Sequence, residues 1–297
     1  MTKRIRFFLV FVVLLILISG AVMWASHSNV PHTTPPPVIV NQSDPFLHQP
    51  WATLNAVLPQ VSHMPTLGEP ASKLLASLGD LETFCQKQFA TAPMTSVTCI
   101  YNAHGQTGRG EMSDVAWTSQ RLTAEGLQGL HPRLVGIEGC WLELFTLEQE
   151  SALDFDFING ELRKSGRQPA TRQEHAAVYE SIVVRSSGAR TYLRHNPVCR
   201  GIGIEDERLH TLHSLVIQLM TAMTNDHREV PPIISALSDA LMDARTDMAM
   251  ARVIDQAHKA GATEAVLPIG ASHLDRMVRL RGYLKAPGDD LDAYSPR

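Results

Sequence analysis

The chain has 297 residues, of which 44% are hydrophobic and 19% charged, a composition typical of a globular protein. Its length suits one large domain or two small ones with a substantial buried core. The formal net charge is −4, and no long basic run lies outside the N-terminus, which argues against nucleic-acid binding.

The first clear pattern is an uncharged apolar run at residues 7–25, which follows Lys3, Arg4 and Arg6. A helix of this length spans about 28 Å, close to the thickness of the bilayer's hydrocarbon core. Basic residues before the run predict a cytoplasmic N-terminus and an exported body. A cleaved signal peptide is the alternative, but its apolar core is shorter, and Ala25–Ser26 is a poor cleavage site. We expect a single-pass signal-anchor in the inner or plasma membrane, with the body in the periplasm if the cell is Gram-negative.

A second segment, residues 26–50, is rich in Pro, His, Ser and Asn, with three consecutive prolines from Pro35 to Pro37. Such a composition is typical of a stiff, extended spacer. We therefore predict a transmembrane anchor at residues 1–25, a Pro-rich linker at residues 26–50 and an extracytoplasmic α/β domain at residues 51–297.

Beyond the linker, short β-rich or apolar segments alternate with amphipathic ones. Helical periodicity is found at residues 74–89, 113–130 (with Ser113 as N-cap), 145–187 (broken near Gly166 and Pro169), 209–223, 232–260 (one long helix or a broken pair, followed by Gly261) and 273–281. Strands are predicted at residues 95–101, 134–137, 202–204 and 265–269. This alternation predicts an α/β fold, a mostly parallel sheet flanked by helices, preceded by one N-terminal transmembrane helix.

One short pattern occurs twice. VGIEGCWLEL (residues 135–144) resembles IGIEDERLHTL (residues 202–212), and each places Gly-Ile-Glu at the end of a predicted strand. The repeat indicates either a duplicated half-domain or a coincidence of three identical residues.

The four cysteines form no CxxC pair, so a zinc ribbon or a thioredoxin-like motif is not supported. Export predicts an oxidising compartment. We therefore expect two disulfide bonds. Of the three possible pairings, the one that joins Cys85 with Cys99 closes a short local loop and leaves Cys140 with Cys199. Buried free thiols are the alternative.

Each of the four predicted strands is followed by an imidazole or a carboxylate: His104 after residues 95–101, Glu138 after 134–137, Glu205 after 202–204 and His273 after 265–269. Because the carboxyl ends of parallel strands meet at one edge of a sheet, we expect these side chains on one rim. A His and a Glu can together take a proton from water, and two His with a carboxylate can hold a divalent metal ion. Each residue alone has a plainer explanation, as a loop histidine or a charge in a first helical turn. The prediction therefore depends on all four residues occurring at the same kind of strand end.

Arg245 is the fifth candidate, because it borders the apolar face of the helix predicted at residues 232–260. Its guanidinium can reach the rim and stabilise a developing oxyanion, or pair with Glu138 or Glu205. A salt bridge with Asp243, Asp247 or another acid is the alternative.

Three other patterns carry less weight. Residues 105–110 have the glycine spacing of a phosphate loop, but Glu111 and Met112 follow where Lys and Ser or Thr are required. His210 and His213 share a helix face with Glu207 and are a candidate metal pair, although a solvated helix face is the simpler interpretation. The chain has no Gly-x-Ser-x-Gly motif, so a serine hydrolase of the α/β-hydrolase kind is not supported.

The C-terminal stretch DARTDMAMARVIDQA, followed by AVLPIGASHLDRMVRLRGY, resembles a superfamily that joins TraB/GumN-type proteins, the TIKI metalloproteases, ChaN-like haem-binding lipoproteins and erythromycin esterases. Arg245, Gly270 and His273 match its motif position by position. Asn102 to Gly105 resemble its first histidine motif more loosely, with Tyr101 at a glycine position, and Glu138 resembles the glutamate after its second strand. The match spans roughly residues 95–285. It implies an α/β fold of two or three layers with a shared His/Glu/Arg/His site.

We therefore expect a membrane-tethered hydrolase that cleaves an ester or peptide bond in a small-molecule or peptide substrate. His104, Glu138, Glu205, Arg245 and His273 are its candidate catalytic residues. His104, Glu138 and His273 are candidate ligands of a divalent Mn, Co or Zn ion. The alternatives are an extracytoplasmic module that binds haem or a metal, and a catalytically inactive scaffold of the same fold.

Overall fold

Five β-strands form one sheet within the residues that the computed structural model describes, which are 45–92, 95–103, 113–164, 166 and 168–284. The strand order is β1-β5-β2-β4-β3; β1, β5, β2 and β4 pair in parallel, and β3 pairs antiparallel with β4. The strands are β1 (Ser96–Asn102), β2 (Leu134–Ile137), β3 (Leu144–Phe145), β4 (Arg200–Gly203) and β5 (Glu264–Gly270). The predicted α/β fold with a mostly parallel sheet is confirmed, and all four predicted strands are present.

The short edge strand β3 was not predicted, because two residues show no periodicity. It explains why β4 contains glycine. A Cβ atom on Gly201 would lie 2.7 Å from the Phe145 ring, and one on Gly203 would overlap the Leu142 carbonyl oxygen. Glycine leaves room for the Phe145 ring at position 201 and for the neighbouring backbone at position 203.

The repeated Gly-Ile-Glu sequences lie at the carboxyl ends of β2 and β4, which are neighbours in the sheet. The register pairs Gly136 with Ile202 and Ile137 with Gly203, so the two copies are staggered by one residue. The pairing brings Glu138 and Glu205 to the same edge of the sheet.

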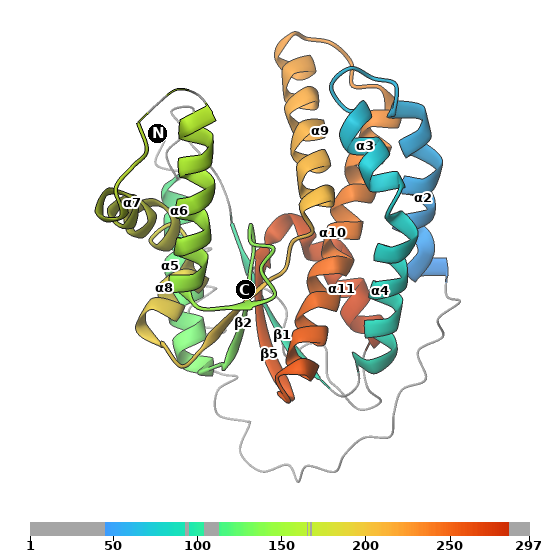
Figure 1. The fold of residues 1–297 in the computed structure, drawn as a ribbon. Coiled ribbons are helices and arrows are strands. Elements are labelled where there is room, and N and C mark those ends of the chain that lie inside the picture. Colours follow the sequence, from blue (N-terminus) through green and yellow to red (C-terminus); the bar gives the residue numbers. More distant parts are fainter. Residues whose placement is uncertain (1–44, 93–94, 104–112, 165, 167, 285–297) are drawn as a thin grey trace, which may run out of the picture. The chain divides into compact units, whose positions relative to one another are not determined.

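Helices cover both faces of the sheet (Figure 1). One face is covered by α10 (Pro232–Lys259), with α2 (Pro45–Val61), α3 (Gly68–Leu75), α4 (Leu78–Thr91), α9 (Glu207–Asn225) and α11 (Leu274–Leu284) in the same apolar core. The other face is covered by α5 (Asp114–Leu130) and α8 (Gly188–His195). On that side lie also α6 (Leu147–Lys164), α7 (Arg172–Val178) and the π-helix η3 (Tyr179–Val184). The core is therefore divided between the two faces of the sheet.

Helix boundaries follow the predicted capping residues where the sequence marks them. The Ser113 side chain accepts a hydrogen bond from the Ala116 N–H and caps α5. The long helix α10 is unbroken, and Gly261 beyond it has a φ of +64°, as expected at the C′ position. The helix predicted at residues 74–89 is two helices instead, which meet at Ala76 and Ser77. Apolar spacing continues across that junction, so periodicity did not reveal it.

The predicted linker at residues 26–50 is corrected at its end, because α2 begins at Pro45. Leu47 and Pro50 are already buried on this helix. Helical structure thus starts before the predicted Trp51. The part of the chain that the structure describes has no helix long and apolar enough to cross a membrane. The predicted anchor, residues 7–25, lies outside those residues.

All four cysteines are free thiols, so neither of the two expected disulfide bonds is present. Each is buried, Cys85 and Cys99 in the core on the α10 face and Cys140 and Cys199 in the core on the α5 face. Burial raises the pKa of Cys99 to about 11 and the pKa of Cys140 and of Cys199 to about 12. Thiols in such surroundings stay protonated at neutral pH and pack as small apolar groups.

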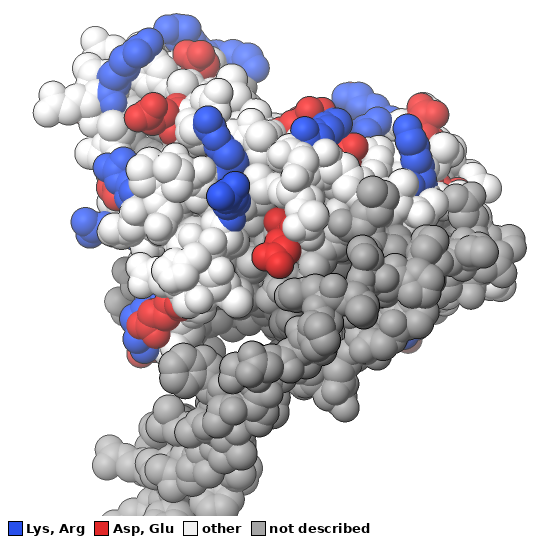
Figure 2. All heavy atoms as spheres, turned by 90° about the horizontal axis from the view of Figure 1, so that it is seen from below, with Lys and Arg blue, Asp and Glu red and all other residues white. Residues whose placement is uncertain are grey.

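Charges of both signs are interspersed over the described part of the face shown in Figure 2. No single sign dominates that part of the face.

Candidate functional site

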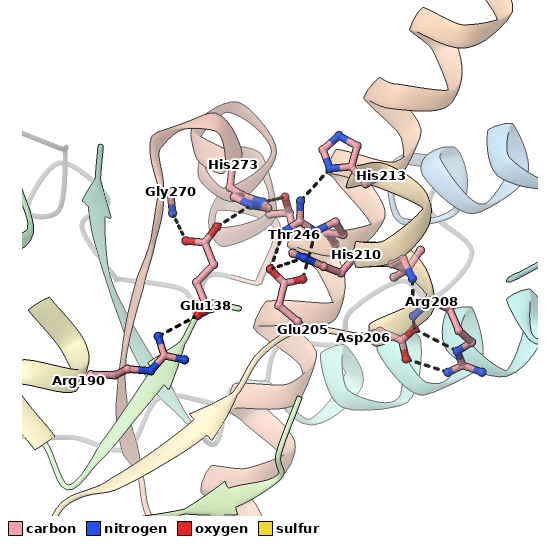
Figure 3. Close-up of polar contacts among 12 residues, drawn as sticks. Glu138, Arg190, Glu205, Asp206, Arg208, His210, His213, Thr246, Gly270 and His273 are labelled. Atoms are coloured by element: carbon pink, nitrogen blue, oxygen red, sulfur yellow. Dashed lines mark hydrogen bonds and ion pairs between the residues drawn. The ribbon is translucent and has the colours of Figure 1, made fainter. Parts of the chain in front are cut away.

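The carboxyl ends of the parallel strands gather most of the predicted residues (Figure 3). Glu138 follows β2 directly, and His273 ends the 3-10 helix η4 (Ala271–His273), which follows β5. The Glu138 carboxylate accepts a hydrogen bond from the Gly270 N–H over 2.9 Å through Oε2. Gly270 pairs in turn with Asn102, the last residue of β1. Three neighbouring strand ends are therefore joined at Glu138.

Glu138 and His273 form the first polar pair of the site. The Oε1 atom of Glu138 lies 3.7 Å from Nε2 of His273, and the two side chains face one another in Figure 3. His273 is buried, whereas the Glu138 side chain remains 21% exposed. The imidazole is thus enclosed by the chain, and the carboxylate beside it is partly open to solvent.

Thr246 on α10 fixes the orientation of the His273 ring. Its hydroxyl donates to the Met242 carbonyl oxygen over 2.8 Å and lies 2.7 Å from Nδ1 of His273. A hydroxyl has one proton, so Nδ1 must be the donor in the second contact. When the ring carries only this proton, it presents the lone pair of Nε2 to Glu138. At 3.7 Å the two atoms are too far apart for a direct hydrogen bond, and two facing lone pairs attract a proton donor or a cation between them.

Arg245 and Glu205 form the second polar pair. Two hydrogen bonds join them, from Nε to Oε2 over 3.1 Å and from Nη2 to Oε1 over 2.5 Å. Of the partners that the sequence allowed for Arg245, the structure selects Glu205; Asp247 pairs with Arg276 instead. Both charges are buried, and a bidentate pair of this kind neutralises itself. Arg245 is therefore committed to holding Glu205.

His213 on α9 is the third partner of Arg245. Its Nδ1 atom lies 2.8 Å from Nη1 of Arg245. The predicted solvated face is wrong for this histidine, because its ring is only 4% exposed. His210 is less buried, and its Nδ1 atom lies 3.9 Å from Oε1 of Glu205. Glu207 is exposed whereas His213 is buried, so these two residues do not share one solvated helix face.

A second ion pair supports the loop that carries Glu138. Arg190 on α8 donates three hydrogen bonds to Glu150 on α6, and its Nη1 lies 3.5 Å from the Glu138 carbonyl oxygen. The Tyr179 hydroxyl donates to the same carboxylate over 2.6 Å. Burial opposes ionisation of Glu150, but the contacts with Arg190 and Tyr179 outweigh it and lower its pKa. The carboxylate is thus charged and holds Arg190 beneath the loop.

The other side of the loop is held by α10. Arg252 donates to the carbonyl oxygens of Trp141 and Gly203 over 3.1 and 3.3 Å. The Glu205 N–H donates to the Cys140 carbonyl oxygen over 3.0 Å. These bonds tie the segment after Glu138 to the segment before Glu205, so the two carboxylates are positioned together.

An open hollow of about 370 Å³ lies apart from these carboxylates, between α6, α7 and η3. Phe155, His175 and Tyr179 line it. His175 is paired with Asp154 over 2.9 Å, and Tyr179 donates to Glu150. Nε2 of His175 and the Tyr179 hydroxyl therefore already have partners within the chain.

The buried position of His213 predicts a pH-dependent stability. Burial, then the charge of Arg245 and the nearby His273 and His210, lower the pKa of His213 from 6.5 to about 3. Between these values the unfolded chain takes up a proton that the folded chain does not. The free energy of unfolding therefore has its full value above pH 6.5 and decreases as the pH falls from 6.5 toward 3. Between pH 7 and 4.5, we expect the wild type to lose about 2–3 kcal/mol relative to His213→Asn. Denaturant titrations at each pH measure this difference, and parallel curves would contradict it.

Of the five predicted site residues, Glu138, Glu205, Arg245 and His273 are brought to one edge of the sheet. His104 lies outside the described residues, as does the loop at residues 105–110. Within the described residues, no group of three or more His, Cys, Asp or Glu side chains is arranged to hold a metal ion. Sequence reasoning missed Thr246, and it misjudged His213. Both lie one helical turn or less from predicted residues, but only the packing of α9 on α10 shows which way they face.

Comparisons with known proteins assign no family to the chain. No protein-family model matches it, and searches of the curated proteins and of the solved structures gave no match. Its function is therefore inferred from the site and from the sequence resemblance.

Proposed function

We propose that this chain is a membrane-tethered hydrolase of an ester or peptide bond and a divergent member of the superfamily that it resembles. The observation that supports this most is the pairing of Glu138 with His273 at the carboxyl ends of adjacent strands. The imidazole has its Nδ1 bound to Thr246, and its Nε2 faces a partly exposed carboxylate. Acid–base catalysis of hydrolysis needs such an oriented pair.

In this proposal Nε2 of His273 takes a proton from a water molecule held between the ring and Glu138 as the water oxygen attacks the carbonyl carbon. The imidazolium then returns that proton to the leaving alkoxide or amine as the C–O or C–N bond breaks. Glu138 orients that water and stabilises the imidazolium that forms. Thr246 keeps the ring in the required tautomer, because its hydroxyl oxygen accepts a hydrogen bond from Nδ1–H. The Gly270 N–H, 2.9 Å from Oε2, keeps the carboxylate at the strand ends. Arg245 and Glu205 form the adjoining wall of the site, and Arg245 does not contact the reacting bond.

A divalent metal ion is compatible with the donors but is not required by them. Glu138 and His273 supply an oxygen and a nitrogen of the kind that Zn²⁺, Mn²⁺ and Co²⁺ accept. The third predicted ligand, His104, follows Asn102 by two residues, and Asn102 pairs with Gly270 beside Glu138. When bound, such an ion would lower the pKa of a coordinated water.

The test is turnover of a broad panel of esters and peptides by the full-length chain in detergent. Each substrate is assayed with Mn²⁺, Co²⁺ or Zn²⁺ and with a chelator. We expect measurable hydrolysis by the wild type and a loss of at least about 100-fold in His273→Ala, because this variant lacks the proposed base. His195→Ala is the matched control, because His195 is exposed at the end of α8. Stimulation by one metal, reversed by the chelator, would support the metal-assisted form.

Two outcomes would contradict the proposal. Turnover by the wild type that equals background removes the enzyme. Tight metal binding without turnover supports the alternative of an extracytoplasmic metal-binding module.

A further inference from the structure

The open hollow between α6, α7 and η3 is built around three aromatic rings. Phe155 and His175 meet edge to face with their ring centres 5.3 Å apart, and His175 stacks on Tyr179 at 6.0 Å. Leu147 and Ala152 on α6 belong to the same wall. The volume of about 370 Å³ is in the range of small-molecule sites. A wall of this kind suits a planar ligand, which packs against aromatic and aliphatic groups.

A π turn places two side chains of this wall. Tyr179 and Val184 both line the hollow, although they are five residues apart on η3. On an α-helix two such residues point about 140° apart. In η3 the Arg185 N–H donates to the Glu180 carbonyl oxygen, five residues earlier, over 3.2 Å, and this wider turn brings positions five apart onto one side. Because π turns are rare and occur frequently at functional sites, this one favours a binding role for the hollow.

His175 supplies the hollow with a hydrogen-bond acceptor. Its Nε2 atom lies 2.9 Å from the Asp154 carboxylate, which only accepts hydrogen bonds, so Nε2 carries the ring proton. Nδ1 has no hydrogen-bond partner among the described residues and, unlike Nε2 of His213, it is not sealed from solvent. Because His175 lines the hollow, the lone pair of Nδ1 in the neutral ring is open to a donor there.

The charges around the hollow select a neutral ligand. The wall carries side chains of both signs, which are Arg172, Arg194, Glu148, Asp156 and Glu180. Arg194 pairs with Glu180 over 3.4 Å. The Arg172 guanidinium lies 5.7 Å from the centre of the Phe155 ring. An anion would meet the carboxylates and a cation would meet the guanidinium groups, so neither gains a clear advantage.

We propose that this hollow binds a small neutral aromatic molecule that carries an O–H or N–H donor, of the phenol or indole class. The ligand ring packs against Phe155 and Tyr179, and its donor binds Nδ1 of His175. This site is separate from the Glu138–His273 pair, so the proposal does not depend on the hydrolase function.

Fluorine NMR of small probes tests the site on the full-length chain in detergent at pH 8, where phenols and histidine rings are neutral. 4-Fluorophenol carries the ring and the donor, and 4-fluoroanisole carries the same ring without a donor. We expect 4-fluorophenol to bind saturably and about 3- to 10-fold more tightly than 4-fluoroanisole, which lacks the hydrogen bond. The anion 4-fluorobenzoate and the cation of 4-fluorobenzylamine should both bind more weakly than 4-fluorophenol.

Substitutions on α7 separate this site from probe that is taken up by detergent. Ala176 is exposed and lines the hollow, whereas its exposed neighbour Ala177 is not part of the wall. Ala176→Trp fills the space without removing a hydrogen bond and should abolish saturable binding, while Ala177→Trp should retain it. His175→Phe keeps a ring but removes Nδ1, and it should lower the affinity for 4-fluorophenol to that for 4-fluoroanisole. Denaturation midpoints check that each variant is folded.

Three results would overturn the proposal. The first is the absence of saturable 4-fluorophenol binding in the wild type. The second is binding that Ala176→Trp leaves unchanged, since the probe then occupies another surface. The third is equal or tighter binding of 4-fluoroanisole or of either charged probe, which removes the contact with His175 and with it the ligand class. Because none of these measurements involves turnover, they leave the test of the hydrolase separate.

Discussion

Glu138→Gln should reduce turnover about 100- to 10,000-fold without unfolding the chain. Glutamine retains an oxygen for the Gly270 N–H, which Glu138 binds over 2.9 Å, so the strand ends stay joined. The substitution removes the negative charge 3.7 Å from Nε2 of His273, and with it the stabilisation of an imidazolium. The measurement is kcat on the best substrate, with the denaturation midpoint as a check on folding.

A second variant tests whether the pair acts as a unit. His273→Asn keeps a donor near the position of Nδ1 for Thr246 and removes Nε2, and we expect a loss similar to that of Glu138→Gln. The double variant should be little worse than either single one, because groups in one catalytic step are not additive.

Controls for the pair come from the same chain. Glu143→Gln changes a glutamate on the β2–β3 connection whose side chain is 75% exposed, and His195→Ala changes an exposed histidine. Neither should alter kcat. Full activity in Glu138→Gln or His273→Asn would remove the pair from the mechanism.

The sequence predicted the edge of the sheet at which the site lies but not the hydrogen bonds within the site. Strand ends are marked by short apolar segments, so the residue pattern alone assigns Glu138, Glu205 and His273 to one rim. The pattern does not contain the register, and it is the parallel pairing of β2 with β4 and β5 that sets the spacing of these side chains.

Residues on helices were harder to place, because periodicity gives a buried face but not the neighbour. Arg245 borders the apolar face of its helix whether it pairs with a carboxylate at the rim or with another acid. Only the packing of α9 on α10 shows that its partners are Glu205 and His213. His213 looked like a solvated residue because the helix that covers it is distant in sequence. The cysteines were misjudged for a related reason: their even number suggested pairing, whereas each is buried in an apolar core.

The largest effect on stability is expected at Asp247 and Arg276, which form a completely buried ion pair. The exposed fractions are 0% for Asp247 and 1% for Arg276. Arg276 donates to the two carboxylate oxygens over 2.8 and 2.7 Å, and to the Phe46 carbonyl oxygen over 3.0 Å. Its guanidinium also lies 4.0 Å from the centre of the Phe46 ring. The pair therefore joins α10 and α11 to the first turn of α2.

Asp247→Ala should destabilise the fold by about 3–5 kcal/mol, because it leaves the Arg276 cation buried without its partner. The ion pair itself adds little to the free energy of unfolding, because the cost of burying the carboxylate exceeds its attraction to Arg276. Burial accordingly raises the pKa of Asp247 to about 6 even though Arg276 lowers it. Replacing both residues with apolar ones, as in Asp247→Leu with Arg276→Met, should therefore recover most of the loss. Denaturant unfolding, followed by fluorescence, measures both. Asp226→Ala, in the exposed pair with Arg228, should change little. A loss below about 1 kcal/mol in Asp247→Ala would show that Arg276 finds water or another acceptor, and that the pair does not hold α2 in place.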